Sequence, residues 1–211
     1  MGIDAKTSKI LSQTYFIVSG CFILFGLGLF GNTFVHIGIS WLLSLVGTIT
    51  GLFMFCTESP KLKAYFISIG ALGLGFGAGA YCTYRGLDNS EITFCALATA
   101  LTFVSATLAS LVTRELTLLY ISVATLFLFA YIPLSIYYIF SWGFTSLYLL
   151  LSLGLVISVI CLMIDTHKII LSIEGGVIDP FILSWILFED VYDLFMNIAK
   201  VMIVNKKKDD D

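Results

Sequence analysis

The chain has 211 residues, of which 59% are hydrophobic and only 12% are charged, and its mean hydropathy is +1.01. Soluble domains carry about 25% charged residues, so this composition excludes an ordinary soluble domain and predicts a polytopic membrane protein. At about 20 residues per span, the length allows six or seven spans and no separate soluble domain. The net charge of −3 comes without a basic stripe, which argues against a nucleic-acid partner.

Charge-free runs mark the predicted spans. The run from Ile10 to Thr57 is twice as long as one span requires, and the turn signal at Gly31-Asn32-Thr33 divides it into a hairpin. The run from Leu116 to Ile164 is also of double length and divides near Ser141-Trp142-Gly143. We therefore predict an all-α membrane domain with seven transmembrane helices, the last of them interrupted by charge. The predicted spans are 14–31, 34–56, 64–84, 92–113, 116–140, 144–164 and 181–204, and a charged tail follows at 205–211.

The third predicted span is rich in glycine. Small residues let helix backbones approach closely where lipid offers no hydrophobic drive between helices. The pattern favours tight helix packing, with a glycine-lined ion path as the alternative. The glycines are Gly70, Gly73, Gly75, Gly77 and Gly79.

Lysine and arginine in the short loops predict the orientation. With the N-terminus inside, the outer loops hold only Arg85, so we expect a cytoplasmic N-terminus. A complete seventh span would place the three lysines at 206–208 outside. Either the last segment re-enters without crossing, or this tail is too weak to override six earlier spans. The bacterial cell membrane is the expected location, with a eukaryotic endomembrane as the alternative. The inner side collects Lys6, Lys9, Lys61, Lys63, Arg114 and Lys168.

The last predicted span carries Glu189, Asp190 and Asp193 within two turns. A carboxylate near the middle of a bilayer costs about 2.5–3.5 kcal/mol, and such residues indicate ion pathways, proton relays or ligand sites. Helical spacing aligns Asp190, Asp193 and Asn197 on one stripe with Glu189 beside it, and we expect this stripe to face the interior of the helix bundle. The alternative is the wet face of an interfacial amphipathic helix.

Asp165 lies at the inner end of the sixth predicted span. A polar connection follows, and the chain returns as the acidic segment, so two antiparallel neighbours bring Asp165 towards its first turns. The alternative for Asp165 is a helix C-terminal residue that reaches interfacial water. We interpret His167 as a solvated loop residue, with a second group titrating near neutrality as the alternative.

These residues resemble the Bax-inhibitor-type (transmembrane Bax inhibitor motif) family. The specific part is Asp165-Thr166 at the end of the sixth span and a second acidic motif 25 residues later. The Gly-Leu-x-Leu-Phe-Gly pattern at 26–31 also looks like the first span of that family. The second motif reads Leu187-Phe188-Glu189-Asp190-Val191-Tyr192-Asp193-Leu194-Phe195.

The resemblance implies a fold of two three-helix layers around a central last helix, and a pH-sensitive calcium leak. In that mechanism Asp165 and Asp190 share a proton, because two carboxylates within hydrogen-bonding distance cannot both ionise cheaply and titrate as a unit. When ionised, the same oxygens suit transient contact with calcium. The implied partners are membrane lipid, calcium ions and protons. No cofactor is implied, and no motif identifies a protein partner.

The chain departs from the family pattern at three places. Bacterial members carry arginines at the inner end of the second span, where one can pair with the acids. Here that stretch has no arginine, and Lys61 or Lys63 could substitute, but only as a point charge on a flexible stem. Glu189 and Asp193 are acids where the family more often has an apolar residue and Asn, and His167 replaces the commoner Gln.

Two other functions stay open on the sequence: a proton-coupled cation exchanger that uses the same acids, and a non-transporting regulator of stress or cell death. We expect no enzymatic activity. Ile164 and Glu189, which precede the two aspartates, do not match the Tyr-Asp and Gly-x-Gly-Asp motifs of intramembrane aspartyl proteases. The five isolated cysteines have neither redox nor zinc spacing.

Overall fold

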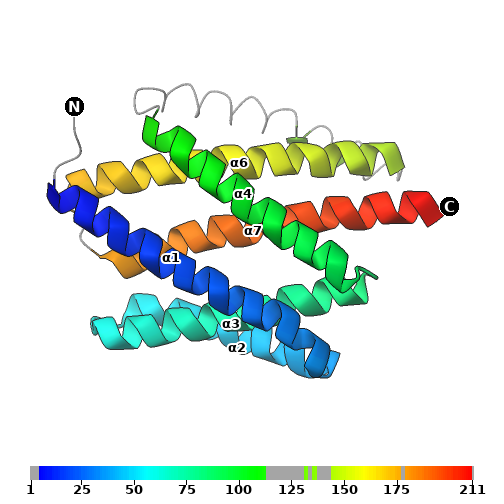
Figure 1. Ribbon diagram of the computed structural model, residues 1–211, viewed down its shortest axis with the longest axis horizontal. Coiled ribbons are helices and arrows are strands. Elements are labelled where there is room, and N and C mark those ends of the chain that lie inside the picture. The colour runs from blue at the N-terminus through cyan, green and yellow to red at the C-terminus, as the bar shows by residue number, and fades with distance from the viewer. Residues whose placement is uncertain (1–4, 113–130, 133–134, 137–143, 177–178, 211) are drawn as a thin grey trace. The chain divides into compact units, whose positions relative to one another are not determined.

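The computed structural model describes residues 5–112, 131–132, 135–136, 144–176 and 179–210. These residues are helical apart from short connections, and no strand occurs among them, so the all-α prediction is confirmed for the described chain (Figure 1). The predicted span 116–140 lies almost wholly outside the described residues, so the seven-span count and the two-layer arrangement stay predictions. The helices are α1 (Ala5–Gly31), α2 (Ile37–Phe53), α3 (Pro60–Tyr84), α4 (Asn89–Val112), α6 (Phe144–Glu174) and α7 (Pro180–Asp210), with short 3-10 helices η1 (Asn32–Phe34) and η2 (Met54–Cys56).

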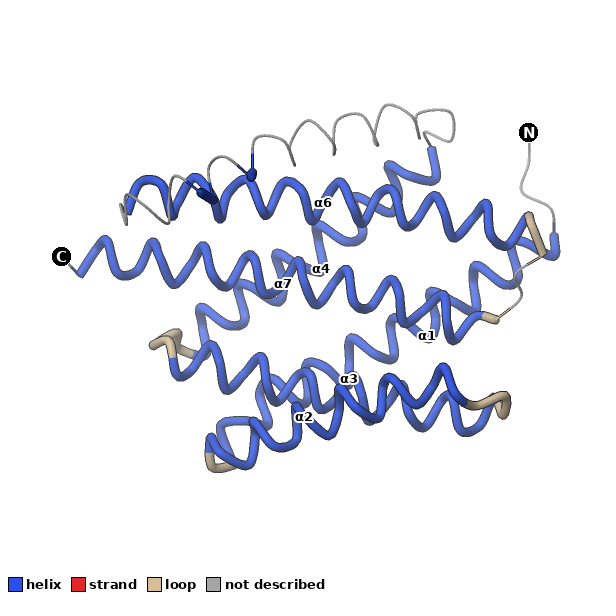
Figure 2. Tube along the Cα trace, turned by 180° about the vertical axis from the view of Figure 1, so that it is seen from behind, coloured by secondary structure: helices blue, strands red, loops and turns tan. Residues whose placement is uncertain are grey.

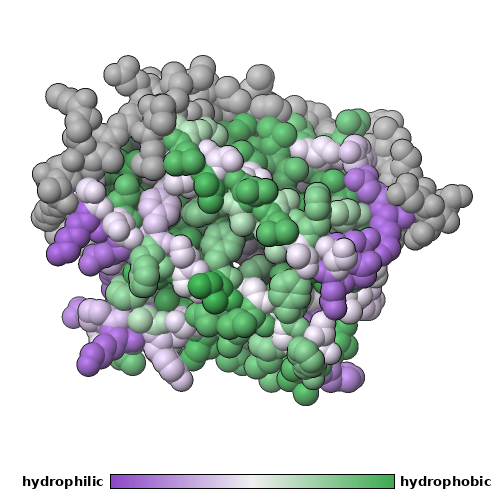
Figure 3. Space-filling model, viewed as in Figure 1, coloured by the Kyte–Doolittle hydropathy of each residue, from purple (hydrophilic) through white to green (hydrophobic). Residues whose placement is uncertain are grey.

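Within the described chain, five helices are long and apolar enough to cross a membrane, as the composition predicts. Large apolar side chains are exposed along them, and Figure 3 shows such residues over much of the visible face, with hydrophilic residues gathered towards helix ends. Helix α7 is not one of the five, because its three acids interrupt the apolar run. The five candidate spans are Thr7–Phe34, Ile37–Cys56, Pro60–Tyr84, Asn89–Ala109 and Leu147–Glu174.

The sixth predicted helix is longer than its charge-free run. Helix α6 continues past 164 to Glu174, so His167 lies within a helix, and the prediction that it lies in a loop is wrong. The charges of Asp165 and Lys168 end the apolar run in composition, but the inward-facing apolar positions go on: Ile169, Ile170 and Ile173 are all buried. The helix ends only at Gly175-Gly176, where Gly176 adopts a φ of 100° that favours glycine.

The chain divides into two compact units. Unit 1 comprises Met1–Ile92 and Ile169–Glu189, and unit 2 comprises Thr93–Lys168 and Asp190–Asp211. Unit 1 therefore holds α1, α2, α3 and the first turns of α7, and unit 2 holds most of α4, most of α6 and the rest of α7.

In unit 1, helix α3 packs against both α1 and α2 (Figures 1 and 2). A Cβ atom placed at Gly73 would lie 2.6 Å from the Cα of Gly47, so the two backbones touch where neither residue has a side chain. Gly75 and Gly79 likewise lie against backbone atoms of α1, whereas Gly77 lies against the side chain of Ser44 on α2. Tight packing is thus the role of this glycine pattern, as predicted, because helix contacts occupy these positions.

Candidate functional site

In unit 2, helices α6 and α7 run side by side in opposite directions, and one hydrogen bond defines their register (Figure 2). The amide Nδ2 of Asn197 donates to the Oγ of Ser158 at 2.6 Å. Asp165 follows Ser158 by seven residues, and Asp190 precedes Asn197 by seven. Seven residues are close to two turns at about 3.6 residues per turn, so both acids return to the faces that meet at this hydrogen bond. The register therefore places Asp165 opposite Asp190.

A lysine lies at the same level as the two acids. The Nζ of Lys168 forms an ion pair with Asp165 Oδ1 at 2.9 Å, and the charge of Asp190 also acts on this ammonium group. Cys161 lies on the same face of α6, one turn before Asp165, within electrostatic range of both aspartates and of Asp193. Lys168 is thus a counter-charge that the sequence reasoning missed. Its spacing of three residues from Asp165 on a helix was the signal that could have revealed it.

The acids of α7 differ in exposure. Asp190 and Asn197 are half-buried, whereas Glu189 and Asp193 are exposed. Since each residue turns a helix by about 100°, Asp190 and Asn197 lie roughly 20° apart and Asp193 lies about 60° to one side of Asp190. Of the three residues expected on an interior stripe, only Asp190 and Asn197 are half-buried. Asp193 lies at the exposed edge of that stripe.

Glu189 has a partner of its own. The indole Nε1 of Trp185, one turn earlier on α7, donates to Glu189 Oε1 at 2.6 Å. Trp185 is only 2% exposed, so its ring anchors the carboxylate of an otherwise exposed residue. A hydrogen bond to an ionised acceptor is about twice as strong as one between neutral groups. Glu189 therefore binds Trp185, whereas Asp190 lies opposite Asp165, although Glu189 and Asp190 are neighbours in the chain.

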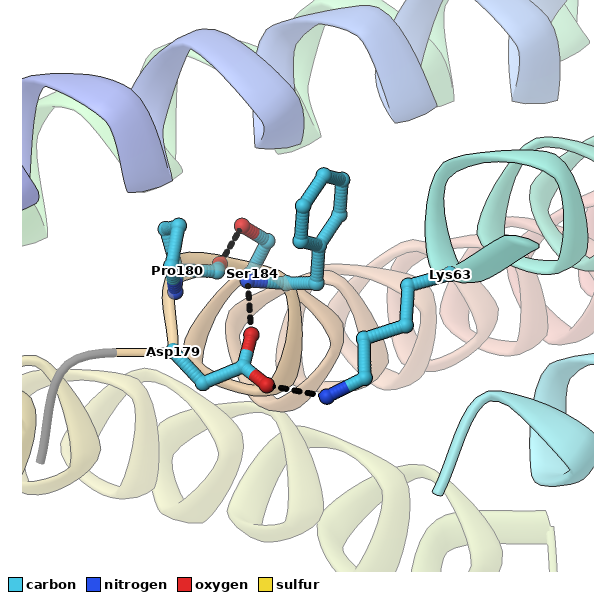
Figure 4. Close-up of polar contacts among 5 residues, drawn as sticks. Lys63, Asp179, Pro180 and Ser184 are labelled. Carbon is cyan, nitrogen blue, oxygen red and sulfur yellow. Dashed lines mark hydrogen bonds and ion pairs between the residues drawn. The ribbon is translucent and has the colours of Figure 1, made fainter. Parts of the chain in front are cut away.

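The two lysines near the start of α3 take different places. Lys61 is exposed, while Lys63 forms an ion pair with Asp179, and the Lys63 side chain is only 11% exposed (Figure 4). Asp179 also caps α7, because its Oδ1 accepts the backbone N–H of Phe181 at 3.0 Å, directly after Pro180 at the first helical position. The charge of Lys63 thus stabilises the start of α7 within unit 1.

A serine ties the same helix start to α1. The hydroxyl of Ser184 donates to the carbonyl of Pro180, the contact drawn in Figure 4, and to the carbonyl of Thr14 on α1 at 3.2 Å. Ser184 and Thr14 are both fully buried. The start of α7 is therefore held to α3 by an ion pair and to α1 by a hydrogen bond.

His167 is separated from the acid pair by the geometry of α6. It lies two residues after Asp165, which places it about 200° around the helix, on the opposite face. The side chain is 4% exposed, and its Nδ1 has no hydrogen-bond partner in the described part of the chain. His167 is therefore a buried helical residue rather than the solvated loop residue predicted.

In the described chain, no group of three or more His, Cys, Asp and Glu side chains is arranged to hold a metal ion. Asp165 and Asp190 are two carboxylates, and an ion held by so few protein oxygens would keep most of its water. Such a pair suits contact with a passing cation.

The chain is similar over residues 7–207 to a family model described as Bax1-I, inhibitor of apoptosis-promoting Bax1. The match includes both acidic motifs and all the helices named above except the first two residues of α1 and the last three of α7. Comparison with curated proteins gives no match.

Proposed function

The chain belongs to the family described as inhibitor of apoptosis-promoting Bax1, and from this premise we propose that it is a pH-sensitive calcium leak channel of the membrane. The family membership confirms the resemblance inferred from the two acidic motifs. The observation that carries the proposal is the α6–α7 register, fixed at Ser158 and Asn197, which places Asp165 opposite Asp190.

The proposed gate is a proton shared between these two carboxylates. With one proton, the pair forms a bridge between α6 and α7, because a protonated carboxyl donates to the ionised one. Without it, two negative charges repel each other and attract a cation. The pair therefore has two arrangements whose balance pH controls, and calcium moves passively down its gradient in the conducting one.

Asp190→Asn tests the gate directly. Asn is neutral and can donate a hydrogen bond, so it imitates the singly protonated pair at every pH. We expect the calcium flux from proteoliposomes to vary between about pH 5 and pH 8 in the wild type. In the variant we expect it to stay at the value that the wild type shows at the acid end.

The matched control for this test is Asp88→Asn. Asp88 caps α4, where its Oδ1 accepts the N–H of Glu91 at 2.9 Å, and Asn caps a helix equally well. This variant should keep the pH profile of the wild type. A wild-type flux that does not change with pH would exclude the proposed gate.

Lys168→Gln tests the counter-charge. A positive charge beside two carboxylates favours their ionised forms, so its removal should move the pH midpoint of the flux upwards. Because the Lys168 side chain is 61% exposed, solvent screens the interaction, and we expect a shift of about half a pH unit. The shift should shrink in high salt, and Lys61→Gln, at another exposed lysine, should leave the midpoint in place. A downward shift in Lys168→Gln would contradict this role.

Proton-coupled calcium exchange would use the same pair of acids. In an exchanger, protons would move against calcium with fixed stoichiometry, and a proton gradient would drive calcium uphill. A leak gives neither result, so measuring calcium accumulation under an imposed pH gradient separates the two functions. A non-transporting regulator of stress or cell death would show no flux in either assay.

We place the protein in the bacterial cell membrane with its N-terminus in the cytoplasm. The support for this orientation is the excess of lysine and arginine on one side of the predicted spans.

A further inference from the structure

Trp185 of α7 occupies a notch formed by glycines of two neighbouring helices in unit 1. A Cβ atom at Gly51 of α2 would lie 2.6 Å from the indole ring, and one at Gly70 of α3 would lie 2.8 Å from it. Both distances are far below van der Waals contact, so neither position admits a larger side chain while the ring is in place. Phe188 covers the ring, with centroids 5.5 Å apart. The notch therefore fixes the rotation of the α7 turn that leads into the acidic motif.

The polar edge of this ring binds the first acid of that motif. The indole N–H of Trp185 donates to Glu189 at 2.6 Å, so the carboxylate is drawn towards the preceding turn. On the helix, Trp185 and Glu189 lie about 40° apart, whereas Trp185 and Asp190 lie roughly 140° apart. Glu189 is thus held on the side of Trp185, and Asp190 on the side of Asn197, which contacts α6.

We propose that Trp185 is a positioning residue for the acidic face of α7. Seated between Gly51 and Gly70, it holds Glu189 out of the proton-sharing pair, so that Glu189 stays an ionised neighbour of Asp190. The inference rests on the proposed function, because that function assigns proton sharing to Asp165 and Asp190. The inference assigns a role to Glu189, an acid at a position where the family more often has an apolar residue.

The position of Trp185 in the notch is tested by the fluorescence of Trp185 alone, in a background with Trp41→Phe and Trp142→Phe. We expect emission typical of a buried indole and weak quenching by acrylamide. Gly70→Ala should push the ring outwards, shift the emission to the red and increase quenching. The control is Gly20→Ala, the same substitution at a site where an added Cβ meets nothing within 4 Å, and it should leave the spectrum unchanged. An unchanged spectrum in Gly70→Ala would show that the ring of Trp185 does not lie in the notch.

The hold on Glu189 is tested by titrating the infrared carboxyl band of the reconstituted protein without calcium. Trp185→Phe keeps a ring in the notch but removes the N–H that stabilises ionised Glu189, so protonation should begin about half a pH unit higher. Glu189→Gln removes a negative neighbour of Asp190, so the midpoint should move down by a similar amount. The double variant should titrate like Glu189→Gln alone, because the donor then has no carboxylate to stabilise.

These shifts separate positioning from packing. A ring that only fills space predicts no shift in Trp185→Phe, and that result would overturn the proposal. Trp185→Phe could also shift the pH midpoint equally in the wild-type and Glu189→Gln backgrounds. That result would overturn the proposal too. The infrared titration needs no flux, so opposite shifts in a protein that passes no calcium would support the role of Trp185 while contradicting the leak.

Discussion

Replacing Gly73 by Ala is expected to lower the stability of the protein by about 1–3 kcal/mol, the usual range for overpacking a tight core. A Cβ atom at this position would lie 2.6 Å both from the Cα of Gly47 and from the carbonyl oxygen of Leu43. These are backbone atoms of α2, which cannot move aside as the end of a flexible side chain can. The contact is relieved only if α2 and α3 separate, and that loosens the packing along their whole interface.

Gly20→Ala is the matched control for this prediction. It introduces the same methyl group into α1, where no atom lies within 4 Å of the added Cβ. Alanine stabilises a helix interior over glycine by up to about 1 kcal/mol, so this variant should be as stable as the wild type or more stable. Thermal unfolding in detergent, followed by circular dichroism, measures both variants. If the two variants unfold at the same temperature, close packing is not the role of the α3 glycines.

The glycines show how far the sequence reached in predicting the fold. Their small size on the third span predicted tight helix packing, and the structure confirms close contacts of these glycines with α1 on one side of α3 and with α2 on the other. The spacing could not predict which helices pack against these glycines, because a glycine has no side chain that would indicate a particular partner. That Gly51 and Gly70 receive the ring of Trp185, from a residue more than 100 positions later, follows only from tertiary structure.

The end of α6 shows where charge misled the prediction. Asp165 and Lys168 end a charge-free run, and a boundary placed there is the natural choice for a membrane span. In the structure the two charges pair with each other, and the helix goes on burying Ile169, Ile170 and Ile173 beyond them. A helix boundary depends on whether apolar periodicity stops, and here it continues for three more turns to Glu174.

The candidate site was predictable in its residues but not in its partners. The acidic motifs identified Asp165 and Asp190 from their type and spacing. Their register depends on one hydrogen bond between Ser158 and Asn197, and the sequence offers many other pairs of polar residues. The counter-charge was sought on the second span, where Lys63 instead forms an ion pair with Asp179. Lys168, on the same helix as Asp165, was overlooked because the sequence analysis used it only to predict the orientation of the chain in the membrane.

The sharpest consequence of a shared proton is that removing either acid should have the same effect as removing both. We expect Asp165→Asn, Asp190→Asn and the double variant each to abolish the pH dependence of calcium flux completely. The reason is that a single remaining carboxylate has no partner with which to share a proton. On a double-mutant cycle, the coupling between the two sites should therefore equal the whole effect of either single variant.

Independent carboxylates would give a different result. Each single variant would then remove part of the pH dependence, and the two parts would add in the double variant. Asp193→Asn is the matched comparison, because Asp193 is an exposed acid one turn from Glu189 and lies beside the face that meets α6. It should keep the pH dependence, although the loss of one nearby negative charge should lower the midpoint slightly. Additive single effects, or an Asp193→Asn variant as flat as Asp190→Asn, would show that the gate is a diffuse acidic surface and not a pair.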